Sequence, residues 1–421
     1  MTRVATLIWA CAAVLLTASA AGQEAGNGKT GPLADRPSRP GTHLARVRVL
    51  GDNAWLNLGK PRPDPKYGAA QGRTWSRKMA FAPDLRGAFL YGEGVHGGSS
   101  TRGGRRYYND DLYFYDVNAH AWICCHPGTP LDNPGLTYDK KIGCERDKHG
   151  KIIPVAVSVH AYWTPDYDTD RKMFTMMPSP ASLFWSRALG KHRPYLKDRS
   201  NRDPRWGGYT SAWYWDPRTG KWEVRRVKGA APRCNVDNVY FYSRKLKKGV
   251  NLFRGVWLYD HPTNTWKKVN SRGGGNGAYC YDHKREWIYA VHAQRKDPKR
   301  TNRLSIYDIA NNKWIAPKTE GEAGVRMESN QAFFTYDSAN DVAVFHIHGK
   351  HHVYDPEKKK WTTMPVTAPA EHKTRGFRWC SGFYDEKLNA HFYFNAGDSN
   401  RKPGNMWVWR YKKAKTSQGR R

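Results

Sequence analysis

The chain has 421 residues, too many for one conventional hydrophobic core, yet no stretch between its repeated segments reads as a linker between domains. Seventy Lys and Arg residues stand against 37 Asp and Glu, which gives a formal net charge of +33. A charge of this size says little about fold, but it predicts salt-dependent attraction to polyanions. Beyond the first twenty residues no long apolar stretch occurs, which argues against a membrane span.

The N-terminus has the pattern of a secretory signal peptide. Arg3 precedes the apolar run "VATLIWACAAVLL", and small residues follow at Ala18 and Ala20. We therefore expect a signal peptide over residues 1–22, a flexible segment over 23–44, and a secreted or periplasmic protein. Uronic or sulfated glycans then become the expected polyanions, and nucleic acid is not expected as a physiological partner.

A motif with fixed spacing recurs five times along the rest of the chain. In each copy an Asp closes a run of bulky residues and a Trp follows six positions later. The copies are "DLYFYDVNAHAW", "SAWYWDPRTGKW", "GVWLYDHPTNTW", "RLSIYDIANNKW" and "KHHVYDPEKKKW", which end at Trp122, Trp222, Trp266, Trp314 and Trp361. The last four tryptophans are 44, 48 and 47 residues apart, the length of one four-stranded propeller blade.

Each repeat predicts four short strands, a to d. "GAYCYDHKREWIYAVHA" reads as an a–b hairpin, and "RLSIYD" and the run from Trp314 supply strands c and d. We expect the Asp to accept hydrogen bonds from the amides of the c–d turn, and the Trp to pack against the next blade. Both are structural roles.

The ends of the repeat region predict how the ring closes. "NAWLNLGK", residues 53–60, resembles a strand d without a blade, and "NMWVWRY", residues 405–411, a strand c without a strand d. The prediction is an all-β propeller over 45–411 with six blades, closed by strands from both termini, and a basic tail over 412–421. The second repeat is 100 residues long, so either it carries insertions near 123–155 and 178–210 or it conceals a seventh blade.

These repeats resemble the Kelch-repeat propellers, including the central domain of the galactose oxidase superfamily. The resemblance rests on the five Asp and Trp units and on the glycines of "GVHGGSS", residues 94–100, although the double glycine after strand b is mostly absent. It implies a propeller but not a function, since this fold hosts enzymes, glycan binders and scaffolds. Copper-radical oxidases of that superfamily need a Tyr-His dipeptide, which this chain lacks.

The predicted b–c loops are basic, and they would surround one mouth of the central channel. We assign them to residues 100–110, 186–208, 243–254, 294–302 and 397–404. A second set of basic residues lies just before the predicted innermost strands, with two tryptophans nearby that could stack on sugar rings. These candidate ligand-binding residues are Arg73, Trp75, Arg233, Arg326, Arg375 and Trp379. Arginines that bond blade carbonyls across the ring are the alternative.

Candidates for chemistry are few. Glu328 and His160 could transfer protons if the protein is an acid–base enzyme of the mutarotase or lyase kind acting on an anionic sugar. His346 and His348 share one strand face and could bind a metal, although no carboxylate or Cys lies near them in the sequence. The sequence indicates no cofactor. Among the cysteines, Cys124 or Cys125 could reach Cys144 in a disulfide, and buried free thiols are the alternative to disulfides for Cys234, Cys280 and Cys380.

Overall fold

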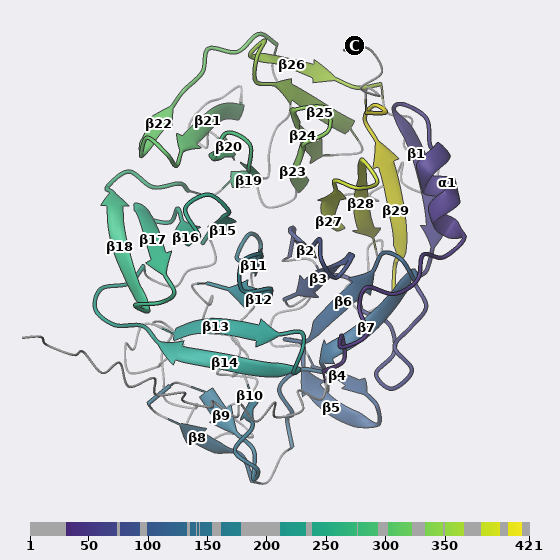
Figure 1. Cartoon of the computed structure of the whole chain (residues 1–421), viewed down its shortest axis with the longest axis vertical. Coiled ribbons are helices and arrows are strands. Elements are labelled where there is room, and N and C mark those ends of the chain that lie inside the picture. The colour runs from purple at the N-terminus through teal and green to yellow at the C-terminus, as the bar shows by residue number, and fades with distance from the viewer. Residues whose placement is uncertain are drawn as a thin grey trace, which may run out of the picture.

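The protein is a six-bladed β-propeller. The computed structural model describes residues 31–73, 76–92, 99–132, 135–139, 141–142, 144–153, 161–177, 211–232, 238–275, 277–293, 302–321, 333–347, 350–365, 380–395 and 403–414. Six four-stranded antiparallel sheets surround a common axis, and each presents its first strand to that axis (Figure 1). The prediction of six blades is confirmed, and the alternative of a seventh is not needed.

The first three blades follow one another in the chain. Blade 1 contains β2 (Ala80–Ala82), β3 (Gly87–Tyr91), β6 (Leu112–Asp116) and β7 (Ala121–His126), with a hairpin of β4 (Ser99–Arg102) and β5 (Arg105–Tyr108) between strands b and c. Blade 2 contains β11 (Pro165–Asp168), β12 (Met173–Met176), β13 (Ser211–Asp216) and β14 (Lys221–Arg226). Blade 3 contains β15 (Tyr240–Ser243), β16 (Lys248–Asn251), β17 (Val256–Asp260) and β18 (Thr265–Asn270).

The last blade is built from both ends of the chain. Blade 4 contains β19 (Gly277–Asp282), β20 (Trp287–Ala293), β21 (Asn302–Asp308) and β22 (Lys313–Ile315), and blade 5 contains β23 (Phe333–Asp337), β24 (Val342–Ile347), β25 (Lys350–Asp355) and β26 (Lys360–Thr363). Blade 6 contains β27 (Cys380–Asp385), β28 (Ala390–Asn395), β29 (Asn405–Arg410) and, as strand d, β1 (Ala54–Gly59). Strand β1 pairs antiparallel with β29, Ala54 opposite Arg410, so the predicted closure is confirmed.

The segment before β1 packs against the ring. Helix α1 (His43–Val49) lies along β1 (Figure 1) and buries Leu44 and Val47 in a core shared with blades 1 and 6. Within the segment that we expected to be flexible, residues 31–42 contain buried Leu33, and Ser38 Oγ donates to Asp116 Oδ1 at 2.8 Å. The C-terminal side of α1 is held by Arg410, whose guanidinium donates to the carbonyl oxygens of Val47, Arg48 and Leu50.

The repeated Asp has the predicted role in every copy. Its carboxylate accepts a backbone N–H from the following c–d turn, over N···O distances of 2.9 to 3.2 Å. The five residues are Asp116, Asp216, Asp260, Asp308 and Asp355. Because the acceptor and its donors lie within three residues, these turn bonds are set by the local sequence.

The a–b turns share a feature that the sequence did not reveal. Each four-residue turn ends on a residue with a left-handed backbone, φ between 47° and 59°. These residues are Arg86, Lys172, Lys247, Glu286, Asp341 and Asn389. Left-handed φ is costly for most side chains, so the repeated geometry of the hairpin, rather than residue preference, dictates it.

The repeated tryptophans lie between blades, as predicted. Trp122 packs edge-to-face on Phe394 of blade 6, with ring centroids 4.9 Å apart. Trp222 lies edge-on to His126 of blade 1 at 6.0 Å. Trp314 differs, because it is only partly buried and its Nε1 donates to the Arg272 carbonyl oxygen at 3.0 Å.

A repeated tyrosine–acid hydrogen bond lies at the a–b end of the ring, and in three of its five copies it joins neighbouring blades. In blades 2 to 6 a tyrosine near the end of the innermost strand donates its hydroxyl to an acid in an a–b hairpin, of either its own blade or the preceding one. The pairs are Tyr167–Asp84, Tyr242–Asp170, Tyr281–Glu286, Tyr336–Asp341 and Tyr384–Asp337. Blade 1 has Phe81 at the matching position, where it stacks on Phe383 at 5.2 Å.

The long second repeat carries insertions rather than a blade. Part of the first insertion forms a small sheet of β8 (Thr137–Asp139), β9 (Cys144–Arg146) and β10 (Ile152–Ile153). The second expected insertion, residues 178–210, lies outside the described residues.

Candidate functional site

The segment just before β2 carries a lysine to the axis of the ring. Backbone bonds fix this segment on both sides: Met79 N–H donates to Gly382 O at 2.9 Å, and Lys78 N–H donates to Tyr162 O at 3.2 Å. Gly382 belongs to blade 6 and Tyr162 precedes the innermost strand of blade 2. Lys78 is therefore anchored between two neighbouring blades at the end of the ring where the innermost strands begin.

The side chain of Lys78 crosses blade 2 and reaches blade 3. Its Nζ donates to the Tyr240 carbonyl oxygen at 2.7 Å, lies 3.5 Å from Asp166 Oδ2, and sits 4.0 Å from the centre of the Phe241 ring. Asp166 is itself oriented, because it accepts the Tyr242 N–H at 2.7 Å. The ammonium group thus has one carbonyl, one carboxylate and one aromatic face as neighbours.

Burial changes the protonation of this lysine. Only 13% of the side-chain surface is exposed, and the loss of water lowers the pKa of Lys78 to about 8, although Asp166 acts in the opposite direction. Near neutral pH a measurable fraction of the amine is therefore unprotonated. A lysine of this kind can act as a cation, a base or a nucleophile.

Other polar side chains gather at the same end of the innermost strands. Ser381 Oγ donates to the Ser76 carbonyl oxygen at 2.7 Å, which joins blades 6 and 1. Within the described residues, the hydroxyls of Ser76 and Thr164 are fully buried and have no hydrogen-bond partner. Groups of this kind are costly to leave unpaired.

At the opposite end, the a–b end, charged side chains meet across the axis. Arg244 of blade 3 lies 3.5 Å from Glu386 of blade 6, and His283 of blade 4 lies 3.6 Å from the same carboxylate oxygen. All three residues are the first of their a–b turns. Since blades 3 and 6 face each other in a six-membered ring, the Arg244–Glu386 pair spans the axis at this end.

Arg73, a predicted ligand-binding residue, is buried in a charge cluster of blade 1. It is 1% exposed and forms an ion pair with Asp111. Arg102, from the β4–β5 hairpin, donates to the other carboxylate oxygen of Asp111 at 2.7 Å and to Asn109 Oδ1 at 3.0 Å. The expected direct contact between Arg73 and a ligand is therefore replaced by a structural ion pair.

The adjacent Asp110 is a perturbed acid that the sequence analysis missed. Its carboxylate accepts the backbone N–H and the hydroxyl of Thr129 at 2.7 and 2.6 Å. Burial raises the pKa of Asp110 to about 7 against the opposing effect of these two bonds, and Asp111 adds to the increase. In the sequence, the adjacent acids Asp110 and Asp111 directly before strand c were the signal that could have pointed to this cluster.

Most of the other predicted site residues lie outside the described part of the chain. They are Trp75, His160, Arg233, Arg326, Glu328, His348, Arg375 and Trp379. Three of the predicted arginines share one position relative to the blades. Each lies seven residues before the first residue of an innermost strand, and they are Arg73, Arg233 and Arg326.

One predicted basic loop belongs to the other end of the ring. We expected residues 243–254 to form a b–c loop, but residues 244–247 are the a–b turn of blade 3, and 248–251 are strand b. The error arose because strand b, "KGVN", is short, has no apolar alternation and directly follows the basic turn "RKLK", so both were taken for one loop. The expected loop over 100–110 is the β4–β5 hairpin, whose Arg105 and Arg106 are part-exposed.

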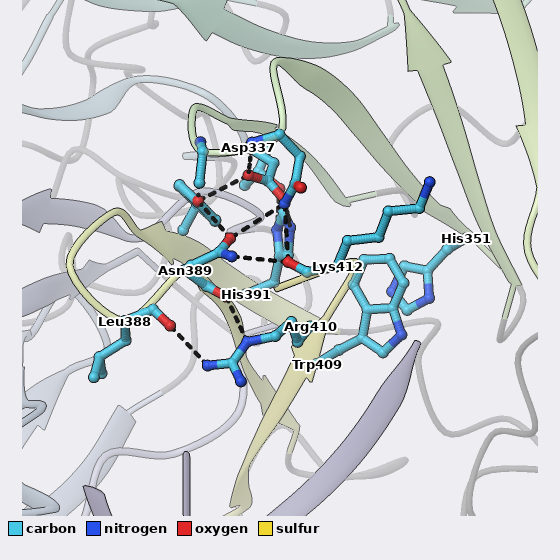
Figure 2. A network of polar contacts seen from close by, with 12 residues as sticks. Asp337, His351, Leu388, Asn389, His391, Trp409, Arg410 and Lys412 are labelled. Atoms are coloured by element: carbon cyan, nitrogen blue, oxygen red, sulfur yellow. Dashed lines mark hydrogen bonds and ion pairs between the residues drawn. The ribbon is translucent and has the colours of Figure 1, made fainter. Parts of the chain in front are cut away.

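His346 lies in an aromatic cluster between blades 5 and 6. It is fully buried, 4.4 Å from the His351 ring centre and 5.2 Å from that of Tyr393. His351 stacks on Trp409 at 3.6 Å, as Figure 2 shows. In the part of the chain that the structure describes, no group of three or more His, Cys, Asp or Glu side chains could hold a metal ion.

A polar network adjoins this cluster. His391 Nδ1 bonds to Thr335 Oγ1 at 2.9 Å, and its Nε2 lies 3.6 Å from Asp337 Oδ2. Asn389 accepts the Tyr384 hydroxyl and donates to the Lys412 carbonyl oxygen, so the network joins blades 5 and 6 to the C-terminal segment (Figure 2). Asp337, Asn389 and His391 are buried within this network, so we assign it a structural role.

The four described thiols are free. Cys124, Cys125 and Cys144 form no disulfide, and neither does Cys280. Burial raises the pKa of Cys280 and Cys125 well above that of an ordinary thiol. The possible disulfide from Cys124 or Cys125 to Cys144 is therefore absent, and Cys280 is a buried free thiol, a poor nucleophile.

Comparison with known proteins leaves the chain without an assigned family: no protein-family model matches it, and no curated protein does. None of the described helices has the length and apolar character needed to cross a membrane. What the molecule itself establishes is an all-β, six-bladed propeller with a strongly basic composition and a buried lysine at its axis.

Proposed function

We propose that this propeller is an exported binding module of the Kelch-like type whose ligand is an acidic glycan or another extracellular polyanion. The observation that carries the proposal is the position of Lys78, a cation on the axis of a protein with net charge +33. Lys78, from blade 1, contacts blades 2, 3 and 6 there, where the innermost strands begin around the central channel. The signal-like residues 1–22 support the extracellular setting.

The charge around Lys78 is suited to an anion. Asp166 lies at 3.5 Å, longer than a close ion pair, so the lysine retains attraction for a second carboxylate or sulfate. Arg233, Arg326 and Arg375 precede the innermost strands of blades 3, 5 and 6 in the sequence. At the position just before strand c, where blade 1 has Asp111 to pair with Arg73, these blades have Gly255, Gly349 and Gly404. The sequence therefore offers these arginines no acid at that position, and they remain candidates for the ligand.

Binding to neutral, uronic and sulfated polysaccharides, measured at low and at about physiological salt, tests the proposal. We expect selective binding to one acidic class that survives moderate salt, and weaker binding by Lys78→Met. Lys172→Met, which removes an equal charge from an a–b turn, is the matched control. Equal binding to every polyanion, erased by salt, would mean that the net charge acts without a site.

A second candidate function is acid–base chemistry on an anionic sugar. The observation that favours it is the closeness of Lys78 to Asp166, because a partly deprotonated amine beside a carboxylate can move protons. Product formation from the bound sugar, lost in Lys78→Arg while binding is retained, would favour this function over binding alone.

A further inference from the structure

Lys78 is more deeply buried and more rigidly held than anion binding requires. An exposed lysine on a loop would attract a carboxylate equally well, without the cost of burial. Here the amine is instead 87% buried, since 13% of its surface is exposed, and it is held by a carbonyl oxygen at 2.7 Å and by backbone bonds to two blades. A rigidly placed, desolvated amine is the usual form of a lysine nucleophile.

We propose that Lys78 forms a reversible imine with the carbonyl carbon of an acidic sugar in its open-chain form. The inference rests on the proposed function for the acidic part of the ligand, and on the geometry of Lys78 for the covalent step. The ligand class is an aldose or ketose that carries a carboxylate, such as a uronic acid.

The step is balanced without any further reagent. The lone pair of Nζ attacks the carbonyl carbon, a C–N bond forms, and the π electrons of C=O move to the oxygen. Asp166, 3.5 Å from Nζ, is placed to take a proton from nitrogen and to return it to the oxygen. Loss of water then gives the imine, so one amine and one aldehyde yield one imine and one water with no change of oxidation state.

The surroundings of Nζ favour this chemistry. Phe241 covers one side at 4.0 Å and limits access of water, which would hydrolyse the imine. Asp166 is the charged group that faces the amine, and its orientation is fixed by the Tyr242 N–H. Burial also keeps part of the amine unprotonated near pH 8, which supports the same conclusion.

Reductive trapping tests the inference on the whole protein. The wild-type chain is incubated at pH 8 with glucuronic acid and cyanoborohydride, digested, and each lysine is scored for the adduct by mass spectrometry. The free-amine fraction at Lys78 exceeds that of an ordinary lysine, so we expect trapping there to be roughly tenfold faster than at exposed Lys172. Glucose, which lacks the carboxylate, should react more slowly than glucuronic acid at Lys78 but equally at Lys172.

Two outcomes separate this inference from the proposed function. If Lys78 is trapped no faster than Lys172, even by a small uncharged aldehyde, the imine is overturned whatever the polysaccharide assays show. If Lys78 is trapped quickly but glucose and glucuronic acid react equally, the preference for an acidic ligand is overturned. The variant Lys78→Arg keeps the positive charge and cannot form an imine, so it should lose the adduct, and its acidic-glycan binding measures the charge without the covalent step.

Discussion

Arg244 and Glu386 join opposite sides of the ring. Their side chains come from blades 3 and 6, yet Nη1 lies 3.5 Å from Oε1. With His283 at 3.6 Å from the same oxygen, this contact occupies the axis at the a–b end. A ligand that reaches Lys78 would therefore enter from the other end, where the innermost strands begin.

The Arg244–Glu386 pair should contribute weakly to stability. Both side chains are about 40% exposed, at 39% and 43%, so solvent screens the pair. A double-mutant cycle with Arg244→Met and Glu386→Gln should give a coupling energy of about 0.2–1 kcal/mol in urea titrations, and 1 M salt should reduce it. A coupling that does not respond to salt would contradict the assignment as a solvent-exposed ion pair.

Lys78 should make stability depend on alkaline pH. The pKa of Lys78 is about 8 in the folded protein and 10.5 in an unperturbed lysine, so the unfolded chain binds more protons between these values. The free energy of unfolding of the wild-type protein should therefore rise, relative to that of Lys78→Met, as pH increases from 8 to 10.5. Urea titrations at pH 7.5, 9 and 10.5 measure this difference, and Lys172→Met should show no such trend.

Asp110 should make the protein less stable, not more stable, as pH rises through the acidic range. Its pKa is about 7 in the folded protein and 3.8 in an unperturbed aspartate, so the folded protein binds the extra proton over this interval. The wild-type protein should lose stability relative to Asp110→Asn as pH rises from 3.8 to 7, and most of the loss should be complete above pH 7. Thermal melts across this range check the trend, with exposed Asp35→Asn as control. A difference that stays constant with pH would show that Asp110 does not titrate in this way.

Arg410 should be among the residues whose loss costs most stability. Besides its three acceptors at the end of α1, it donates to the carbonyl oxygens of Leu388 and Asn389 at 2.9 and 3.0 Å. Arg410→Met removes all five hydrogen bonds of the guanidinium, including those to buried Val47 and Leu388, and we expect a loss of about 3 kcal/mol or more in the free energy of unfolding. Arg46→Met removes one exposed bond to Asn57 O and should cost less than about 0.5 kcal/mol.

The left-handed position of Lys172 offers a stabilising substitution. Its φ of 57° is strained for a side chain with a Cβ atom but not for glycine. Lys172→Gly should raise the free energy of unfolding by up to about 1 kcal/mol, whereas β-branched Lys172→Val should lower it. If both variants change stability in the same direction, the backbone at this turn does not dominate the effect.

The sequence predicted features that depend on neighbours in the chain. The c–d turns were predictable because Asp308 and its partner Asn311 are three residues apart, and the spacing of the tryptophans set the blade length. Ring closure was predictable for a related reason: the incomplete blades at the two ends complement each other. None of these inferences required knowledge of distant contacts.

The environment of Lys78 could not be predicted from its neighbours in the chain. Its acceptor, the Tyr240 carbonyl, is 162 residues away and meets it only when blades 1 to 3 are assembled. Arg73 was misassigned for the same reason, since Asp111 lies 38 residues further on and is brought to it by the folding of blade 1. A basic residue in isolation does not reveal whether its partner is a ligand or a carboxylate of the same chain.

The pairing of β1 with β29 also constrains how the protein can be made. Blade 6 stays incomplete until Asn405–Arg410 has left the ribosome and met Ala54–Gly59, which is synthesised long before it. Contacts so distant in sequence form slowly. The ring is therefore expected to close only after β29 has been synthesised, and until then the nascent chain depends on its other blades, or on chaperones, to avoid aggregation.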